Sequence, residues 1–114
     1  MNAPAIQQLS ADVCAAPQLD PAAMAWAASA GFRSVINNRP DFEGGPDQPT
    51  SAAIEAAALA AGLRYVHLPV QPSAQTPDEI ARFAALLGEL PKPILAFCRS
   101  GTRSGKLYRA ATGG

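Results

Sequence analysis

Cys98 is the residue of this sequence with the clearest signs of reactivity. It follows the apolar residues 94–97 and precedes a run of small and basic residues that leads into a helix-compatible segment. This order is typical of a strand, an anion-binding loop and a helix. Backbone N–H groups of residues 99–104 and the positive end of the helix would then surround the thiol. Because such a field favours the thiolate, we expect an accessible, nucleophilic Cys98 with a pKa below the ~8.5 of free cysteine.

The spacing from Cys98 to Arg103 narrows this chemistry. Four residues separate the two, whereas cysteine-dependent phosphatases use five, and Ser104 stands at the next step. The shorter loop resembles that of single-domain rhodaneses, which carry a sulfane sulfur on the cysteine as a persulfide. The alternative is a buried cysteine that behaves as a small hydrophobe. Against it, two arginines, two glycines and three hydroxyl residues crowd the next eight positions, a composition with no packing rationale.

Length and composition exclude several other classes. The 114 residues suffice for one domain, residues 1–114, with one core. Nine basic and nine acidic side chains leave a formal charge of zero, so we expect no binding to nucleic acid or to a membrane surface. The first residues resemble no targeting signal and no apolar run is long enough to span a membrane, which predicts a cytoplasmic protein. A single histidine, His67, and two distant cysteines predict no metal site and no cofactor.

The elements that must position Cys98 alternate along the chain. Residues 6–13 are predicted as an edge strand or an extended arm, and Pro17 then ends regular structure. Further strands are predicted at 32–38, 63–70 and 94–97, and helices at 22–30, 50–61, 76–90 and after the cysteine loop. This alternation predicts an α/β fold with a mostly parallel central sheet covered by helices on both faces. The Cys98 loop then lies at the carboxyl edge of the sheet, where such folds place ligands.

A second charged loop, residues 39–49, follows a predicted strand and belongs to the same edge. Arg39, Asp41 and Glu43 are therefore candidates for the rim of the site, and Asp41 is a candidate acid. The alternative is a solvated surface loop in which Arg39 pairs with a carboxylate. We interpret His67, in the following strand, as a hydrogen-bonded structural histidine rather than an acid or base.

Six segments together resemble one bacterial family, the phosphatase-like domain that is often fused to β-lactamase-fold hydrolases of sulfur metabolism. The segments are 35–41, 48–49, 60–62, 67–70, 76–77 and 97–104. The resemblance extends from about residue 6 to the end, and the cysteine motif is its most specific part. It implies the fold of dual-specificity tyrosine phosphatases, with Cys98 as nucleophile and Arg103 as side-chain clamp. The implied anion cradle consists of Arg99, Ser100, Gly101, Thr102 and Ser104.

The resemblance also implies a partner. The fused domain in this family is typically a persulfide dioxygenase. This chain has no histidine cluster for such a metal-binding domain and ends early in its last predicted helix. We therefore expect a stand-alone version that is either naturally short or truncated.

Three functions remain open, because family members are described both as phosphatases and as sulfurtransferases. Phosphoester hydrolysis needs an acid for the leaving alkoxide, and in the related fold it comes from the loop equivalent to 71–76, which has no carboxylate here. Asp41 or Asp78 would serve only in a rearranged geometry. Sulfur transfer needs no such acid. We therefore expect a sulfurtransferase that carries sulfur on Cys98 from thiosulfate or a low-molecular-weight persulfide to a thiol or cyanide. The alternatives are a cysteine-dependent protein or small-molecule phosphatase and a non-catalytic anion-binding module.

Overall fold

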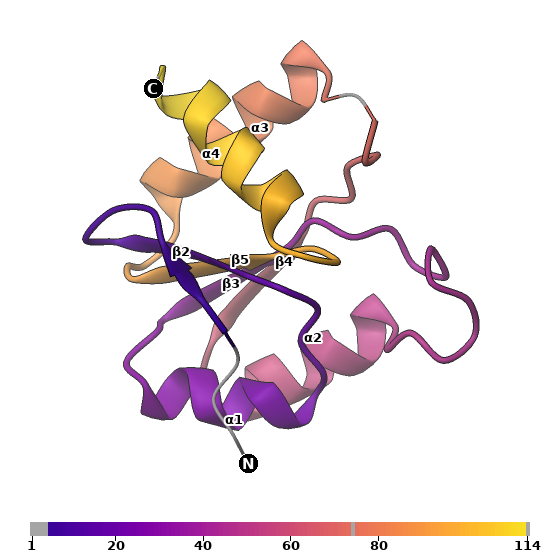
Figure 1. Cartoon of the computed structure of the whole chain (residues 1–114). Helices are drawn as coiled ribbons and strands as arrows, with labels where there is room; N and C mark the ends of the chain where they lie inside the picture. The colour runs from indigo at the N-terminus through magenta and orange to yellow at the C-terminus, as the bar shows by residue number, and fades with distance from the viewer. Residues whose placement is uncertain (1–4, 74, 114) are drawn as a thin grey trace.

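A five-stranded sheet lies between two helical layers in the computed structural model, which describes residues 5–73 and 75–113 (Figure 1). The strand order is β1-β2-β5-β3-β4, with β1 antiparallel to β2 and all other neighbours parallel. The strands are Gln7–Gln8 (β1), Val13–Ala16 (β2), Ser34–Asn37 (β3), Arg64–His67 (β4) and Ile94–Phe97 (β5). The helices are Ala22–Ser29 (α1), Ser51–Ala60 (α2), Pro77–Glu89 (α3) and Thr102–Thr112 (α4). The predicted α/β fold with a mostly parallel sheet is confirmed.

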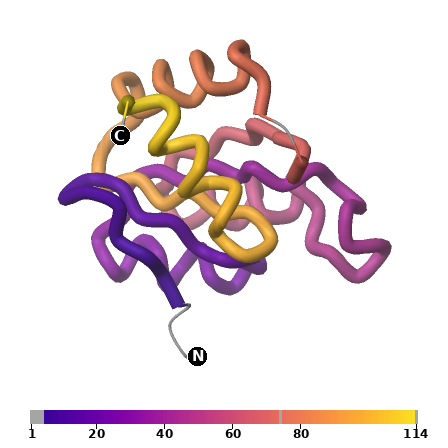
Figure 2. The backbone as a smooth tube through the Cα atoms, turned by 45° about the horizontal axis from the view of Figure 1, so that its top comes forward, coloured from indigo at the N-terminus to yellow at the C-terminus, as the bar shows by residue number. Residues whose placement is uncertain are grey.

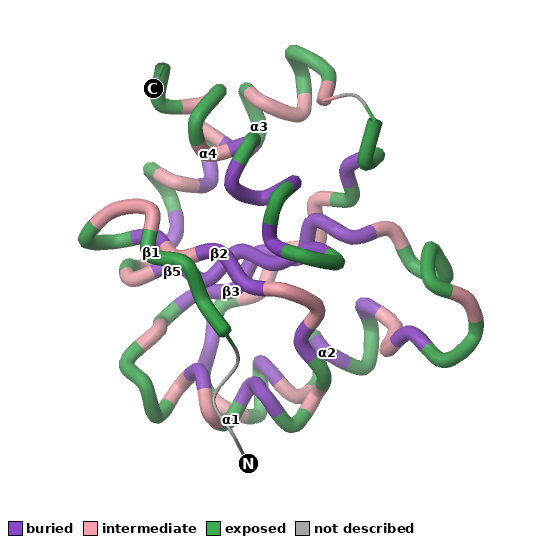
Figure 3. The backbone as a smooth tube through the Cα atoms, in the orientation of Figure 1, coloured by how far each residue is buried: buried purple, intermediate pink, exposed green. Residues whose placement is uncertain are grey.

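Two separate cores lie on the two faces of the sheet. Helices α1 and α2 cover one face, while α3 and α4 run side by side over the other (Figures 1 and 2). Because successive side chains of a strand point to opposite faces, Val35 packs into the first core and Ile36 into the second. Figure 3 shows the buried strands between partly exposed helices. None of the helices within the described residues is long and apolar enough to cross a membrane.

Threonine side chains cap the starts of α2 and α3. Thr50 accepts a hydrogen bond from the Ala53 N–H at 3.2 Å. Thr76 and Glu79 each accept from the backbone N–H of the other, at 3.1 and 2.8 Å, which satisfies two donors at the start of α3. These caps fix where the segments that follow β3 and β4 end, so they also bound the loops at the edge of the sheet.

The beginning of the chain differs from the prediction of one strand or arm over 6–13. The edge strand β1 is two residues long, and β2 lies inside the sheet, paired in parallel with β5. Ala15 and Ala16 are weak strand formers by themselves, and both are buried. Tertiary packing against β5 therefore decides this strand, and local sequence preference did not reveal it. As a result, the end of β2 reaches the same edge as Cys98.

Candidate active site

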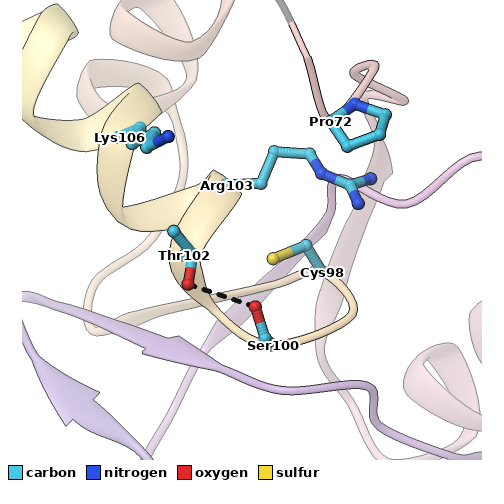
Figure 4. Close-up of a pocket in the computed structure, with 6 residues that line it drawn as sticks. All are labelled: Pro72, Cys98, Ser100, Thr102, Arg103 and Lys106. Carbon is cyan, nitrogen blue, oxygen red and sulfur yellow. Dashed lines mark hydrogen bonds between the residues drawn. The ribbon is translucent and has the colours of Figure 1, made fainter.

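Cys98 follows β5 directly, at the carboxyl edge of the parallel strands. The residue is only 1% exposed, yet it lines a cavity of about 280 Å³. The other lining residues are Pro72, Ser100, Thr102, Arg103 and Lys106 (Figure 4). The expected accessible thiol is thus a buried one that faces a cavity.

Gly101 contacts the sulfur directly. Its backbone N–H donates a hydrogen bond to Cys98 Sγ, with an N···S distance of 3.0 Å. Gly101 caps α4 in the left-handed region, at φ 91°, and an added Cβ would lie 3.4 Å from the backbone of Ala16. Glycine suits this backbone angle, while a Cβ at 3.4 Å would only be in ordinary van der Waals contact with Ala16. The sulfur thus lies beside a backbone donor at the start of α4, where the positive end of the helix dipole is directed.

The end of β2 forms one support of the cysteine loop. The Ala16 carbonyl accepts from the Cys98 N–H at 3.3 Å, and the Arg99 carbonyl accepts from the Gln18 N–H at 3.1 Å. The sequence did not reveal this role, because alanine at positions 15 and 16 gives no local sign of a strand. The loop is consequently held from β2 as well as from β5 and α4.

Arg103 lines the cavity but binds a carboxylate. Its guanidinium donates from Nη1 to Glu43 Oε2 at 3.0 Å and from Nη2 to Glu43 Oε1 at 3.1 Å. Nη1 also donates to the Val70 carbonyl at 3.1 Å. Nε and the second Nη2 hydrogen have no partner among the described residues. The edge formed by Nε and Nη2 can therefore still hold an anion, as the clamp hypothesis requires.

Glu43 joins two arginines at this edge. Its carboxylate also accepts from Arg39 Nε at 2.9 Å, and Arg39 Nη1 donates to Gln18 Oε1 at 3.0 Å. Burial opposes ionisation of Glu43, but hydrogen bonds from Arg103 and Arg39 and their positive charges outweigh it, so the pKa of this carboxyl lies below its usual value. Arg39 is buried and does not line the cavity, so it supports the site from behind the rim.

Several predicted site residues lie elsewhere. Asp41 is not at the cavity, because its carboxylate accepts from the Ser51 N–H at 2.7 Å at the start of α2. Ser104 is buried and donates to Asn38 Oδ1 at 2.8 Å instead of lining the cavity. His67 Nε2 makes a 2.9 Å hydrogen bond to the Arg39 carbonyl, in keeping with its structural interpretation.

The predicted cradle residues divide into two groups. Ser100 and Thr102 line the cavity, joined by a 3.1 Å hydrogen bond between their hydroxyls. Arg99 is exposed and is not among the lining residues. Pro72 and Lys106 at the cavity and Asn38, which accepts from Ser104, were not among the predicted site residues. The one sequence signal for Asn38 is its position in the polar pair Asn37-Asn38, at the end of a predicted strand and therefore at the edge of the sheet that carries Cys98.

The residues lining the cavity combine a thiol, two hydroxyls and two cationic side chains, with no carboxylate among them. Such a set suits an anionic substrate attacked by sulfur. Lys106 projects from α4 on the far side of the cavity from Pro72 (Figure 4). The arrangement can therefore bind an oxyanion over the nucleophile.

Two curated relatives match part of the chain. Beta-lactamase hydrolase-like proteins of Agrobacterium fabrum and Xylella fastidiosa are 41% and 42% identical to it over 78 residues. These residues make up 68% of this chain but 18% of each relative. The chain thus spans less than a fifth of the length of the curated relatives it matches.

Solved structures extend the comparison. A candidate phosphatase from Neisseria meningitidis is 33% identical, with a TM-score of 0.82 over 89% of this chain and 71% of that one. A candidate phosphatase from Shewanella putrefaciens is 21% identical, with a TM-score of 0.80 over 96% and 68%. P. aeruginosa TpbA, solved as a cysteine-to-serine variant with pTyr, is 17% identical, with a TM-score of 0.67 over 96% and 64%.

The likenesses below 25% identity show the fold alone, and that fold is the one of cysteine-dependent phosphatases. The family is shown by a second observation. The sequence profile of the family described as "Beta-lactamase hydrolase-like protein, phosphatase-like domain" matches residues 5–114. The chain therefore belongs to the phosphatase-like domain family of beta-lactamase hydrolase-like proteins, as its sequence motifs indicated.

Proposed function

We propose that this protein is a cysteine-dependent phosphatase that hydrolyses phosphate monoesters through a phosphocysteine at Cys98. The observation that carries the proposal is the Cys98 sulfur, which accepts the Gly101 N–H at 3.0 Å and faces a cavity with two cationic side chains. The family description and the structural relatives favour this function over the sulfur transfer that we expected from the sequence.

The proposed reaction has two steps. In the first, the Cys98 thiolate attacks phosphorus, and the S–P bond forms as the bond from phosphorus to the ester oxygen breaks. In the second, water attacks the phosphocysteine, the S–P bond breaks, and inorganic phosphate and the thiolate are released. The Gly101 N–H stabilises the thiolate between turnovers.

Arg103 is the proposed ligand for two phosphate oxygens. The hydrogens on its Nε and Nη2 form a second donor edge beside the one that Glu43 occupies. Glu43 in turn holds the guanidinium in one orientation, so it is a positioning residue. A guanidinium fixed in advance loses less side-chain entropy when the substrate binds.

Aryl phosphates are the proposed substrate class. No carboxylate of the described part of the chain lines the cavity to protonate a strongly basic alkoxide, whereas a phenoxide leaves more readily. The relative TpbA was solved in complex with pTyr, which is an aryl phosphate. Alkyl phosphates should therefore be poorer substrates than aryl phosphates.

Sulfur transfer is the second candidate, favoured by the four-residue spacing and by the same absence of a carboxylate. In that reaction the thiolate attacks the sulfane sulfur of thiosulfate, the S–S bond breaks, and sulfite leaves with its electron pair. A thiol acceptor then takes the sulfur from the Cys98 persulfide. A persulfide dioxygenase would be a fitting partner for this second function.

One purified sample distinguishes the candidates. We expect hydrolysis of p-nitrophenyl phosphate and phosphotyrosine that is lost in Cys98→Ser and kept in Cys14→Ser. A protein that releases no phosphate but gains roughly 32 Da at Cys98 with thiosulfate, and loses it to cyanide, would be a sulfurtransferase instead. A protein that does neither, yet binds phosphate, would be the anion-binding module.

A further inference from the structure

A second cavity, of about 220 Å³, adjoins the one at Cys98. Pro72 and Lys106 line both cavities, so the two adjoin between α4 and the segment that leads into α3, and together we call them the hollow. The second cavity is otherwise lined by Ser73, Gln75 and Ile80. The Gln75 amide donates to the Arg103 carbonyl at 3.1 Å, which ties this segment to the start of α4.

Lys106 is the cation at the junction of the two cavities. It follows Arg103 by three positions on α4, so the two side chains project from the same face of the helix. Arg103 is held by Glu43 and Val70, whereas Lys106 makes no ion pair with any carboxylate of residues 5–73 and 75–113. Its charge is therefore available to a ligand that reaches from one cavity into the other.

Among residues 5–73 and 75–113, no carboxylate that could serve as an acid lines either cavity. Arg103 cannot release a proton, because a guanidinium stays protonated in proteins. Hydroxyls such as Ser100 and Thr102 are weak acids. Of the groups that line the hollow, the Lys106 ammonium is thus the one that can both stabilise negative charge and donate a proton.

We propose that Lys106 is the catalytic residue that acts on the leaving group, and that the second cavity receives the aryl group of the substrate. This rests on the proposed phosphatase function. As the P–O bond breaks, the ester oxygen gains negative charge, and the Lys106 ammonium stabilises it and gives it a proton. The resulting amine takes a proton from the attacking water in the second step, so the thiolate and the ammonium are both restored.

The composition of the second cavity fits an aromatic ring. Pro72 and Ile80 offer apolar contact to the faces of a ring, and Ser73 and Gln75 add only neutral polar groups. An uncharged aryl group would therefore meet no unpaired charge there except Lys106, which lies at the boundary with the first cavity. For a leaving group that carries further negative charge, Lys106 is the one cationic side chain that this cavity offers.

The test compares leaving groups in matched lysine variants. Lys92 is the other lysine of the sequence and lies, exposed, between α3 and β5, so Lys92→Met is the control. We expect Lys106→Met to lower kcat/KM for phenyl phosphate about 10²-fold more than for p-nitrophenyl phosphate, since the better leaving group needs less help. Lys106→Arg should restore p-nitrophenyl phosphate hydrolysis more than phenyl phosphate hydrolysis, and Lys92→Met should change neither.

Other results of these experiments would overturn the proposal. An equal loss on both substrates would make Lys106 a phosphate-binding residue and overturn the assignment. The absence of any loss would overturn it as well. A parent protein that hydrolyses neither substrate would overturn the proposed function and this assignment with it. Ser73→Trp, which fills the second cavity, should raise KM for phenyl phosphate without changing inhibition by inorganic phosphate. If both parameters stay unchanged, the aryl group does not lie there.

Discussion

Arg103 and Glu43 are 60 residues apart in the sequence and form a two-bond ion pair, with N···O distances of 3.0 and 3.1 Å. The same carboxylate accepts from Arg39, so one acid joins two buried guanidinium groups. Removing one partner of such a network leaves the other charges without compensation. The pair therefore orients the proposed phosphate ligand and attaches the 39–49 loop to α4.

Glu43→Gln should weaken both stability and catalysis. The amide removes the negative charge between Arg39 and Arg103, and we expect a loss of about 1–3 kcal/mol in the free energy of unfolding because the carboxylate is partly solvated. Misorientation of Arg103 should also lower kcat/KM, and by more than the smaller fraction of folded protein explains. Urea unfolding and steady-state kinetics measure the two effects. Glu55→Gln, an exposed change on α2, is the control and should leave both unchanged.

The stabilisation by Glu43 should depend on pH in one direction. Because the pKa of this carboxyl is lower in the folded protein than its usual 4.5, the folded state prefers the ionised form. The full contribution is present above the usual pKa and is lost as pH falls through the lower folded value. The difference in unfolding free energy between the parent and Glu43→Gln should thus be constant at higher pH and shrink below 4.5. A difference that stays constant in acid would contradict the ion-pair account.

Arg103 and Arg109 provide a test of the clamp. Both lie on α4, but only Arg103 lines the cavity, and Arg109 is exposed. Arg103→Lys should lose about 10²-fold in inhibition by vanadate or phosphate, because an ammonium cannot pair with Glu43 and hold two oxygens at once. Arg109→Lys should bind these anions as the parent does. Should both variants bind alike, the clamp must be sought in another residue.

Much of the fold followed from signals that lie close together in the sequence. The caps at Thr50 and Thr76 and the apolar run before Cys98 fixed helices and a strand without any distant contact. The strand at Ala15 and Ala16 escaped prediction, because alanine has no preference for strands and only its pairing with β5 makes one.

The residues of the site also divide into those that the local sequence predicted and those that it did not. The Cys98 loop is local in sequence, so its cavity residues Ser100 and Thr102 were within reach of prediction. The partner of Arg103 was not, because three carboxylates of the 39–49 loop, Asp41, Glu43 and Asp47, have similar surroundings in the sequence. Asp41 was the candidate acid, but the backbone path of the loop places it at the start of α2 and brings Glu43 to both arginines.

Substitution of Gly101 and of Gly31 by alanine distinguishes the cost of backbone strain in stability from an effect on turnover at the site. Both have left-handed φ angles, 91° and 99°, but only Gly101 donates to the Cys98 sulfur and approaches Ala16. Each change to alanine should cost about 1–2 kcal/mol from backbone strain. Only Gly101→Ala should also slow phosphatase turnover, since relief of the strain at its φ of 91° would move the N–H that donates to the Cys98 sulfur. Equal activity in the two variants would show that the N–H to sulfur contact is dispensable.

The two cysteines should differ in their reaction with iodoacetamide. Cys98 faces the anion-binding cavity and accepts the Gly101 N–H, whereas Cys14 is half-buried in the first core, where burial raises the pKa of its thiol. Cys98 should therefore be alkylated first, as peptide mass spectrometry can show. Phosphate or vanadate should protect it, because an anion held by Arg103 and Lys106 would lie over the sulfur. The same anions should leave the slow labelling of Cys14 unchanged. If Cys14 reacts first, or if phosphate protects both thiols equally, the cavity at Cys98 is not the anion site.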